Sequence, residues 1–224
     1  MTTTAAEGSP LSGASKPRLR GWLHAGALPV ALVAGFVLVA LGPTPQSRLA
    51  AAVYAVTSGL LFGISATYHR GALSPRLEEV LHRLDHANIY LIIAGTYTPF
   101  ALLALDGPAR PVVLAVIWAG AVAGVLFRVL WTSAPRWLST ALYIALGWTA
   151  VFVLPQLVAG AGVVAVLLVL AGGLLYTAGG VVYGLRRPDP SPRWFGFHEV
   201  FHALTVAAYL VQYVAVSLVV YAAG

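Results

Sequence analysis

The sequence contains no cysteine and few charged residues: Asp, Glu, Lys and Arg together make up 9% of its 224 positions. The absence of cysteine excludes disulfides and thiolate metal sites, so any metal ligands must be His, Asp or Glu. Soluble domains carry roughly 25% charged residues, and this chain therefore has too few to cover a surface that faces water. The composition predicts an integral membrane protein.

Seven apolar segments of roughly membrane-spanning length follow a small, polar stretch at residues 1–21. We expect this stretch to be a disordered tail and residues 22–224 to form one membrane domain. Breaks rich in proline, glycine and charge separate the segments, except that the fifth-to-sixth break carries no charge. The segments cover about residues 22–42, 49–69, 83–105, 111–131, 138–156, 160–184 and 197–222. The predicted fold is an all-α, seven-transmembrane helix bundle.

Basic residues gather on one side of this predicted bundle. With seven spans, the tail and the second, fourth and sixth loops share a side. That side holds Lys16, Arg18, Arg20, Arg70, Arg76, Arg83, Arg128, Arg136, Arg186, Arg187 and Arg193, and the opposite side holds Arg48 and Arg110. The positive-inside rule then predicts a cytoplasmic N-terminus and a C-terminus outside. The net charge of +6 thus reflects topology and does not indicate nucleic-acid binding.

Polar side chains inside the apolar segments default to functional candidates, because a membrane interior tolerates few of them. They form three groups: Ser65 with His69, His82 with Asp85 and His86, and His198 with Glu199 and His202. The predicted topology puts the first group at the cytoplasmic end of the second span and the others at the cytoplasmic starts of the third and seventh. All three groups therefore share one depth in the membrane.

The last group forms "HEVFH", a match to the H-E-x-x-H pattern of zinc peptidases. Those enzymes usually take their third ligand downstream, but no His, Asp or Glu follows His202, so the peptidase interpretation fails. Two histidines four residues apart share a helix face, and a third imidazole would complete a zinc site with an open fourth position. His69 is the best candidate for that third ligand, with His82 and His86 as rivals.

Asp85 has two possible roles beside such a metal. It could hold a water molecule on the metal and act as general base, or it could orient a histidine ligand. Ser65 could donate a hydrogen bond to a carbonyl or oxyanion. Glu199 is a second candidate base, although a glutamate at this boundary more often extends toward cytoplasmic arginines such as Arg193. His24, near the start of the first span, is interpreted as an interfacial residue without a role.

Three stretches carry a family resemblance: "SATYH", "HRLDHANIYLIIAGTYTPF" and "HEVFH". Over roughly residues 18–222 the chain resembles the bacterial hemolysin III family, which is related to the progestin and adipoQ receptors and, more distantly, to alkaline ceramidases. The resemblance implies a seven-helix bundle in a bacterial inner membrane with a cytoplasmic N-terminus.

The resemblance also implies a site. In the family pattern, zinc is held by His69, His198 and His202, with Asp85 beside the metal-bound water and Ser65 nearby. The ceramidase and receptor relatives imply a zinc-dependent hydrolase of a lipid amide or ester, with a membrane lipid as substrate. Two alternatives stay open: a regulator of membrane homeostasis or lipid sensor with structural zinc, and a cytolysin, for which the sequence offers no span with a continuous polar stripe.

Overall fold

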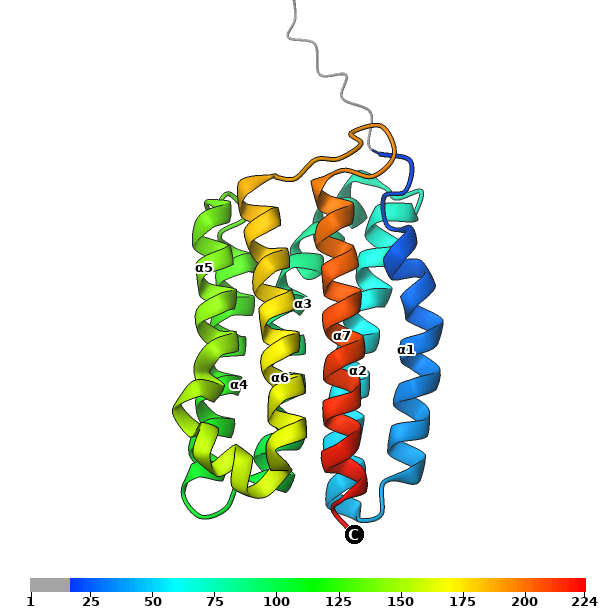
Figure 1. The fold of residues 1–224 in the computed structure, drawn as a ribbon. Helices are drawn as coiled ribbons and strands as arrows, with labels where there is room; N and C mark the ends of the chain where they lie inside the picture. Colours follow the sequence, from blue (N-terminus) through cyan, green and yellow to red (C-terminus); the bar gives the residue numbers. More distant parts are fainter. Residues whose placement is uncertain (1–16) are drawn as a thin grey trace, which may run out of the picture.

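A computed structural model describes residues 17–224, which form a bundle of helices (Figure 1). The helices in this range are α1 (Trp22–Leu41), α2 (Pro45–Arg70), α3 (Pro75–Ala104), α4 (Ala109–Leu130), α5 (Arg136–Gly147), the 3-10 helix η1 (Trp148–Val153), α6 (Leu154–Leu185) and α7 (Phe197–Tyr221). None of these described residues forms a strand, apart from one isolated bridge between Ser191 and Phe195. Most of the tail predicted to be disordered lies outside the described residues, and residues 17–21 form a turn that leads into α1.

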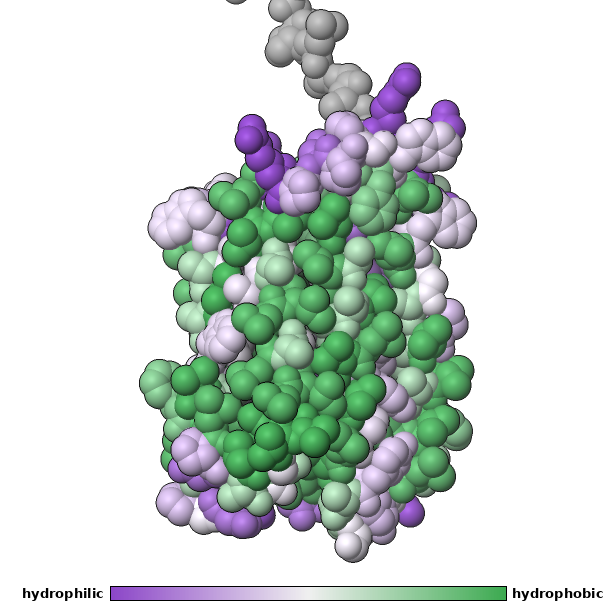
Figure 2. Space-filling model, viewed as in Figure 1, coloured by the Kyte–Doolittle hydropathy of each residue, from purple (hydrophilic) through white to green (hydrophobic). Residues whose placement is uncertain are grey.

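Within residues 17–224, six helical segments are long and apolar enough to cross a membrane. They are α1, α2, α3, α4, α7 and the stretch Arg136–Leu185, which contains α5, η1 and α6. Apolar side chains dominate the middle of the molecule, and hydrophilic residues gather at its two ends (Figure 2). The protein is therefore a multi-pass membrane protein, as its composition predicted.

The Arg136–Leu185 stretch is 50 residues long and changes direction within its length. After η1, the backbone leaves helical geometry at Gly162, where φ is 81°. That conformation favours glycine, because a Cβ atom would be strained there. As a result, α5 and α6 lie side by side as two separate rods in Figure 1. The sequence predicted a break between residues 156 and 160, close to Gly162, but α5 ends earlier than the predicted fifth segment, at Gly147.

The third helix begins earlier than the apolar pattern predicted, at Pro75 rather than at residue 83. Proline is favoured in the first helical turn because its fixed φ suits a helix and its missing N–H needs no partner there. Arg83 pairs with Glu79 one turn earlier on the same helix. These polar turns extend the helix beyond its apolar part, so hydrophobicity alone could not locate its start.

The helix α3 lies at the centre of the bundle, in contact with α2, α4, α5, α6 and α7. Its most apolar part is 67% buried inside the protein, whereas that of α1 is 22% buried. The described N-terminal end and the loops at 71–74, 131–135 and 186–196 lie at one end of the bundle, and the C-terminus lies at the other (Figure 1). The end of α2, the early turns of α3 and the start of α7 are thereby brought together.

Gly160 of α6 packs so closely against the end of α3 that a side chain has no room. A Cβ atom there would lie 1.9 Å from the carbonyl oxygen of Ala104. We expect Gly160→Ala to lower the free energy of unfolding by about 1–3 kcal/mol, because the backbones would have to separate. Thermal unfolding in detergent measures this. Gly173→Ala on the same helix is the control, since its Cβ would meet no atom within 4 Å, and equal unfolding midpoints for the two variants would contradict this packing.

Candidate metal centre

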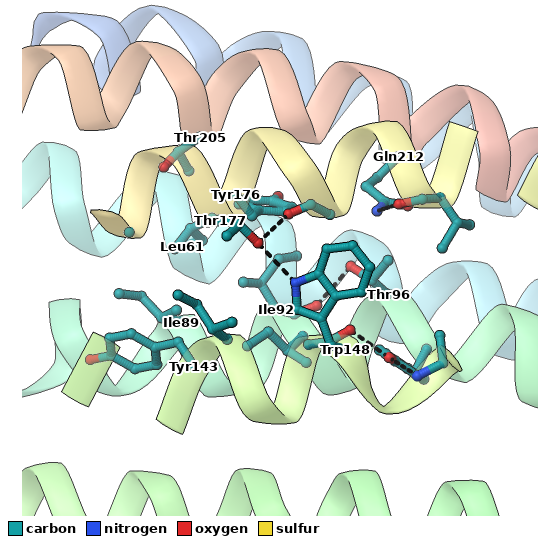
Figure 3. Close-up of a pocket in the computed structure, with 18 of the residues that line it drawn as sticks. Leu61, Ile89, Ile92, Thr96, Tyr143, Trp148, Tyr176, Thr177, Thr205 and Gln212 are labelled. Atoms are coloured by element: carbon teal, nitrogen blue, oxygen red, sulfur yellow. Dashed lines mark hydrogen bonds between the residues drawn. The ribbon is translucent and has the colours of Figure 1, made fainter. Parts of the chain in front are cut away.

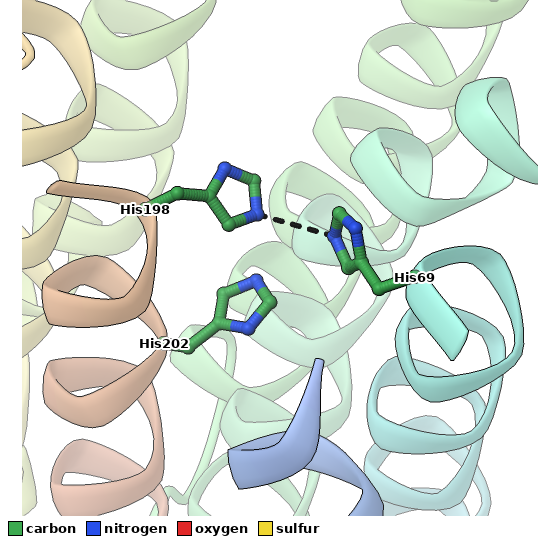
Figure 4. Close-up of side chains that lie close together, drawn as sticks. All are labelled: His69, His198 and His202. Atoms are coloured by element: carbon green, nitrogen blue, oxygen red, sulfur yellow. Dashed lines mark hydrogen bonds between the residues drawn. The ribbon is translucent and has the colours of Figure 1, made fainter. Parts of the chain in front are cut away.

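Three histidines from distant parts of the chain converge near the end of the bundle that carries the described N-terminus (Figure 4). His69 lies in the last turn of α2, and His198 and His202 lie in the first turns of α7. Their ligand atoms all lie within 4.8 Å of one another, although 129 residues separate His69 from His198. The convergence that the shared membrane depth predicted is therefore present in the fold.

The geometry of these three side chains suits a metal ion. The Nε2 atoms of His69 and His198 lie 3.1 Å apart. Two nitrogens bound at 2.0–2.1 Å to a tetrahedral zinc ion would lie about 3.3 Å apart, so the separation of this pair is already close to that of two zinc ligands. His202 completes the group from one turn further along α7, and it is 2% exposed. The structure thus contains a three-histidine group that could bind a metal.

Asp85 and Ser65 lie beside this group. The Oδ2 atom of Asp85 lies 3.7 Å from Nε2 of His69, so the carboxylate of α3 faces the histidine of α2. Ser65 stands one turn before His69 on α2, and its hydroxyl is buried beside the Asp85 carboxylate. The five residues proposed from the sequence therefore occupy one place in the fold, on three different helices.

A cavity extends from this site into the interior of the bundle, and Figure 3 shows residues that line its interior part. Ser65, Asp85, His198 and His202 line one part of it, and Leu105 lines another. Because Asp85 and Leu105 are separated by 20 residues of α3, the cavity extends over about 30 Å at 1.5 Å per residue. Most of its walls are apolar or aromatic, and they include Leu61, Ile89, Ile92, Tyr143, Trp148 and Tyr176.

His82 and His86, the rivals for the third ligand position, are not members of the three-histidine group. Both ring nitrogens of His86 have other partners: Nδ1 lies 2.9 Å from the carbonyl oxygen of His82, and Nε2 lies 2.8 Å from the hydroxyl of Tyr183. The ring of His82 packs against His86 and Tyr68. Of the three candidates, the structure brings only His69 to the α7 pair.

Glu199 has a local structural partner that the sequence analysis did not identify. Its Oε2 atom accepts a hydrogen bond from the backbone N–H of Gly196 at 2.8 Å, which caps the start of α7. Its other oxygen pairs with Arg20, not with Arg193 as expected. The carboxylate is also buried, with 1% of its surface exposed, because its partner comes from the segment that precedes α1 and covers it.

His24, which the sequence predicted to be an interfacial residue without a role, is buried in the protein beside the three-histidine group. It is 2% exposed, and its ring stacks on that of His202 with a centroid separation of 3.8 Å and an interplanar angle of 8°. A lone histidine gives little signal in a sequence. The signal that could have found it is its depth in the membrane. The start of α1 lies at the same end of the bundle as the three polar groups described above.

Comparison with known proteins now assigns the family. The family model described as haemolysin-III related matches residues 12–213. The chain belongs to the hemolysin III family. It is 36% identical to Hemolysin-3 of Bacillus cereus over 140 residues. This alignment covers 62% of this chain and 64% of that protein. It is 32% identical to a Hemolysin-3 homolog of Bacillus subtilis (strain 168) over 141 residues. This alignment covers 62% of this chain and 66% of that protein.

The matched stretches therefore span slightly less than two-thirds of each hemolysin III relative. The resemblance predicted from three short motifs is confirmed at the level of the family.

Elemental analysis of the purified protein tests the metal centre. We expect stoichiometric zinc in the wild type and loss of most of it in His69→Ala, because two imidazoles from one helix cannot hold the ion alone. His82→Ala is the matched control, since His82 lies nearby on α3 but outside the three-histidine group. Retention of full metal content by His69→Ala, or loss of it from the control, would contradict the assignment of ligands.

Proposed function

We propose that this hemolysin III family member is a zinc-dependent hydrolase of a lipid amide or ester, with its site near the cytoplasmic face of a seven-transmembrane bundle. The observation that carries the proposal is the position of the three-histidine group and Asp85 at a long, mostly apolar cavity. A purely structural metal tie between helices would need no such cavity. A hydrolase of lipids needs both a reactive group of this kind and an apolar cavity for its substrate.

The proposed orientation rests on the basic residues at the two ends. The end with the described N-terminus carries ten of the described basic residues, while Arg48 and Arg110 lie at the starts of α2 and α4, at the opposite end. The positive-inside rule makes the first end cytoplasmic. Counting α5 and α6 as two spans, because the chain turns back between them, gives seven crossings and a C-terminus outside.

In the proposed reaction, His69, His198 and His202 would hold a zinc ion, which would supply Lewis-acid chemistry and activate water. Asp85 accepts the proton of the attacking water and passes it to the leaving group, as a general acid–base residue does. The hydroxyl of Ser65 donates a hydrogen bond to the carbonyl oxygen of the substrate as negative charge develops there. Burial of these groups excludes bulk water from the reacting carbonyl.

The cavity fits the apolar part of a lipid. One leaflet of a bilayer accounts for about half of a hydrocarbon core that is roughly 30 Å thick, and the cavity extends at least that far from the site. Its apolar walls gain free energy by burying an acyl chain. An acyl chain bound in the cavity would place its amide or ester carbonyl beside Ser65 and Asp85. The proposed substrate class is therefore a membrane lipid with an acyl group.

Replacement of the proposed base separates turnover from metal binding. We expect Asp85→Asn to retain zinc but to release acyl product from a native lipid extract at least about 100-fold more slowly, because an amide side chain cannot accept the proton. Mass spectrometry of the extract measures product. Asp106→Asn is the control, since Asp106 is exposed outside the cavity near the far end of α3. A zinc-loaded wild type that leaves every lipid intact would contradict hydrolysis.

The name of the relatives supports a second candidate, cytolysis by membrane permeabilisation. Dye release from liposomes that contain the wild-type protein or His202→Ala tests it. We expect both to leave the dye inside, because the cavity lies within the helix bundle and its walls are mostly apolar. Dye release by the wild type that is lost in the variant would favour the cytolysin.

A third candidate is a non-enzymatic regulator or lipid sensor with structural zinc. If Asp85→Asn left the effect of the protein on cells unaltered, that result would favour this candidate over the hydrolase.

A further inference from the structure

We propose that the segment Arg20–His24, at the start of α1, is a clamp that positions all three histidines of the metal centre. The inference rests on the metal centre of the proposed function and adds residues that hold it in shape. The helix α1 contacts both α2 and α7, the two helices that supply the ligands. Each ligand, or the residue next to it, touches one member of the clamp.

The first contact is the stack of His24 on His202. The two rings are nearly parallel, at 3.8 Å between centroids and 8° between planes. Phe62 of α2 meets the His24 ring edge-on at 5.2 Å, so His24 is held between α2 and α7. A ring in face-to-face contact blocks tilting of its neighbour, and this fixes the plane in which the nitrogens of His202 lie. His24 itself lies outside the three-histidine ligand group.

The second contact joins the clamp backbone to His69. Gly21 has φ of 78°, in the region that favours glycine. A Cβ atom at Gly21 would lie 2.6 Å from Cβ of His69, so the backbone of the clamp rests directly on the base of that ligand. Beside it, the guanidinium of Arg70 lies over the ring of Trp22 at 3.9 Å, which ties the end of α2 to the start of α1.

The third contact fixes His198 through its neighbour. Arg20 pairs with Glu199, and Glu199 caps the first turn of α7 at Gly196. The backbone of the preceding residues reinforces this pairing, because the N–H groups of Arg18 and Leu19 donate to the carbonyl oxygens of Arg193 and Trp194 at 3.0 and 3.2 Å. The first turn of α7 therefore cannot fray or rotate without breaking this partly buried ion pair, and His198 lies in that turn.

These contacts give the clamp a role distinct from ligation. Residues that orient metal ligands without touching the metal typically change metal affinity about 10–100-fold when they are replaced. For His24 the orienting feature is a flat ring, so another flat ring should replace it. For Arg20 the orienting feature is a positive charge that reaches Glu199. Both expectations differ from those for a fourth ligand, which only another metal-binding side chain could replace.

Titration of the metal-free, full-length protein in detergent with Co²⁺ tests the clamp, because the visible absorption bands of bound Co²⁺ report the geometry of its ligands. We expect His24→Leu to weaken Co²⁺ binding at least about tenfold and to change the bands. His24→Phe should keep the wild-type bands and affinity. Arg20→Gln should also weaken binding, whereas Arg18→Gln serves as its control, since the Arg18 side chain packs on exposed Trp194.

Each outcome decides a different point. Equal losses in His24→Phe and His24→Leu would make His24 a ligand and overturn the positioning role. Wild-type bands and affinity in both His24→Leu and Arg20→Gln would overturn the clamp while leaving the metal centre intact. A wild-type protein without Co²⁺ bands would overturn the centre and the clamp together. Circular dichroism of each metal-free variant identifies any that fails to fold. If the variants at one of the two positions, His24 or Arg20, fail to fold, the variant at the other position provides the test.

Discussion

The membrane interior offers no water to polar groups, and this constraint favours gathering the polar side chains of the spans at one place. A histidine, carboxylate or hydroxyl inside a span must find its partner within the protein. Here these groups come together at one end of the bundle. His69, His198 and His202 approach one another, Asp85 faces His69, and the charge of Glu199 is met by an arginine. The alternative for each group is an isolated polar atom in hydrocarbon.

The same constraint explains how much of the site the sequence could predict. In a soluble protein, residues 129 positions apart give no hint of contact. In a membrane protein, topology converts a position in the chain into a depth, and only groups at equal depth can meet. Equal depth, together with the four-residue spacing of His198 and His202, was enough to predict a site at this end of the bundle with Asp85 as a candidate member. Depth alone could not choose among His69, His82 and His86, because all three share it, and the choice depended on which helix face points toward α7.

The contacts that the sequence could not predict are those between helices that are not consecutive in the chain. Chain order puts α1 next to α2 but does not reveal that it also packs on α7. Depth alone could therefore not show that His24 and Arg20 contact α7. Glu199 was expected to extend toward arginines such as Arg193, but its partner Arg20 comes from the other end of the sequence. Helix ends were the other weak point, because the start of α3 is set by Pro75 and polar turns rather than by hydrophobicity.

The position of the three-histidine group at the cavity supports the proposed hydrolysis over a purely structural metal site. Structural zinc sites are closed by four protein ligands, whereas catalytic sites keep a position open. Among the described residues, three histidines form this group and no fourth His, Asp or Glu joins it. The carboxylate of Asp85 lies 3.7 Å from Nε2 of His69, and Asp85 lines the cavity together with His198 and His202. Three histidines beside a long, mostly apolar cavity are what the proposed lipid hydrolase would require. The proposed clamp from α1 is compatible with this arrangement, because His24 stacks on His202 without joining the three-histidine group.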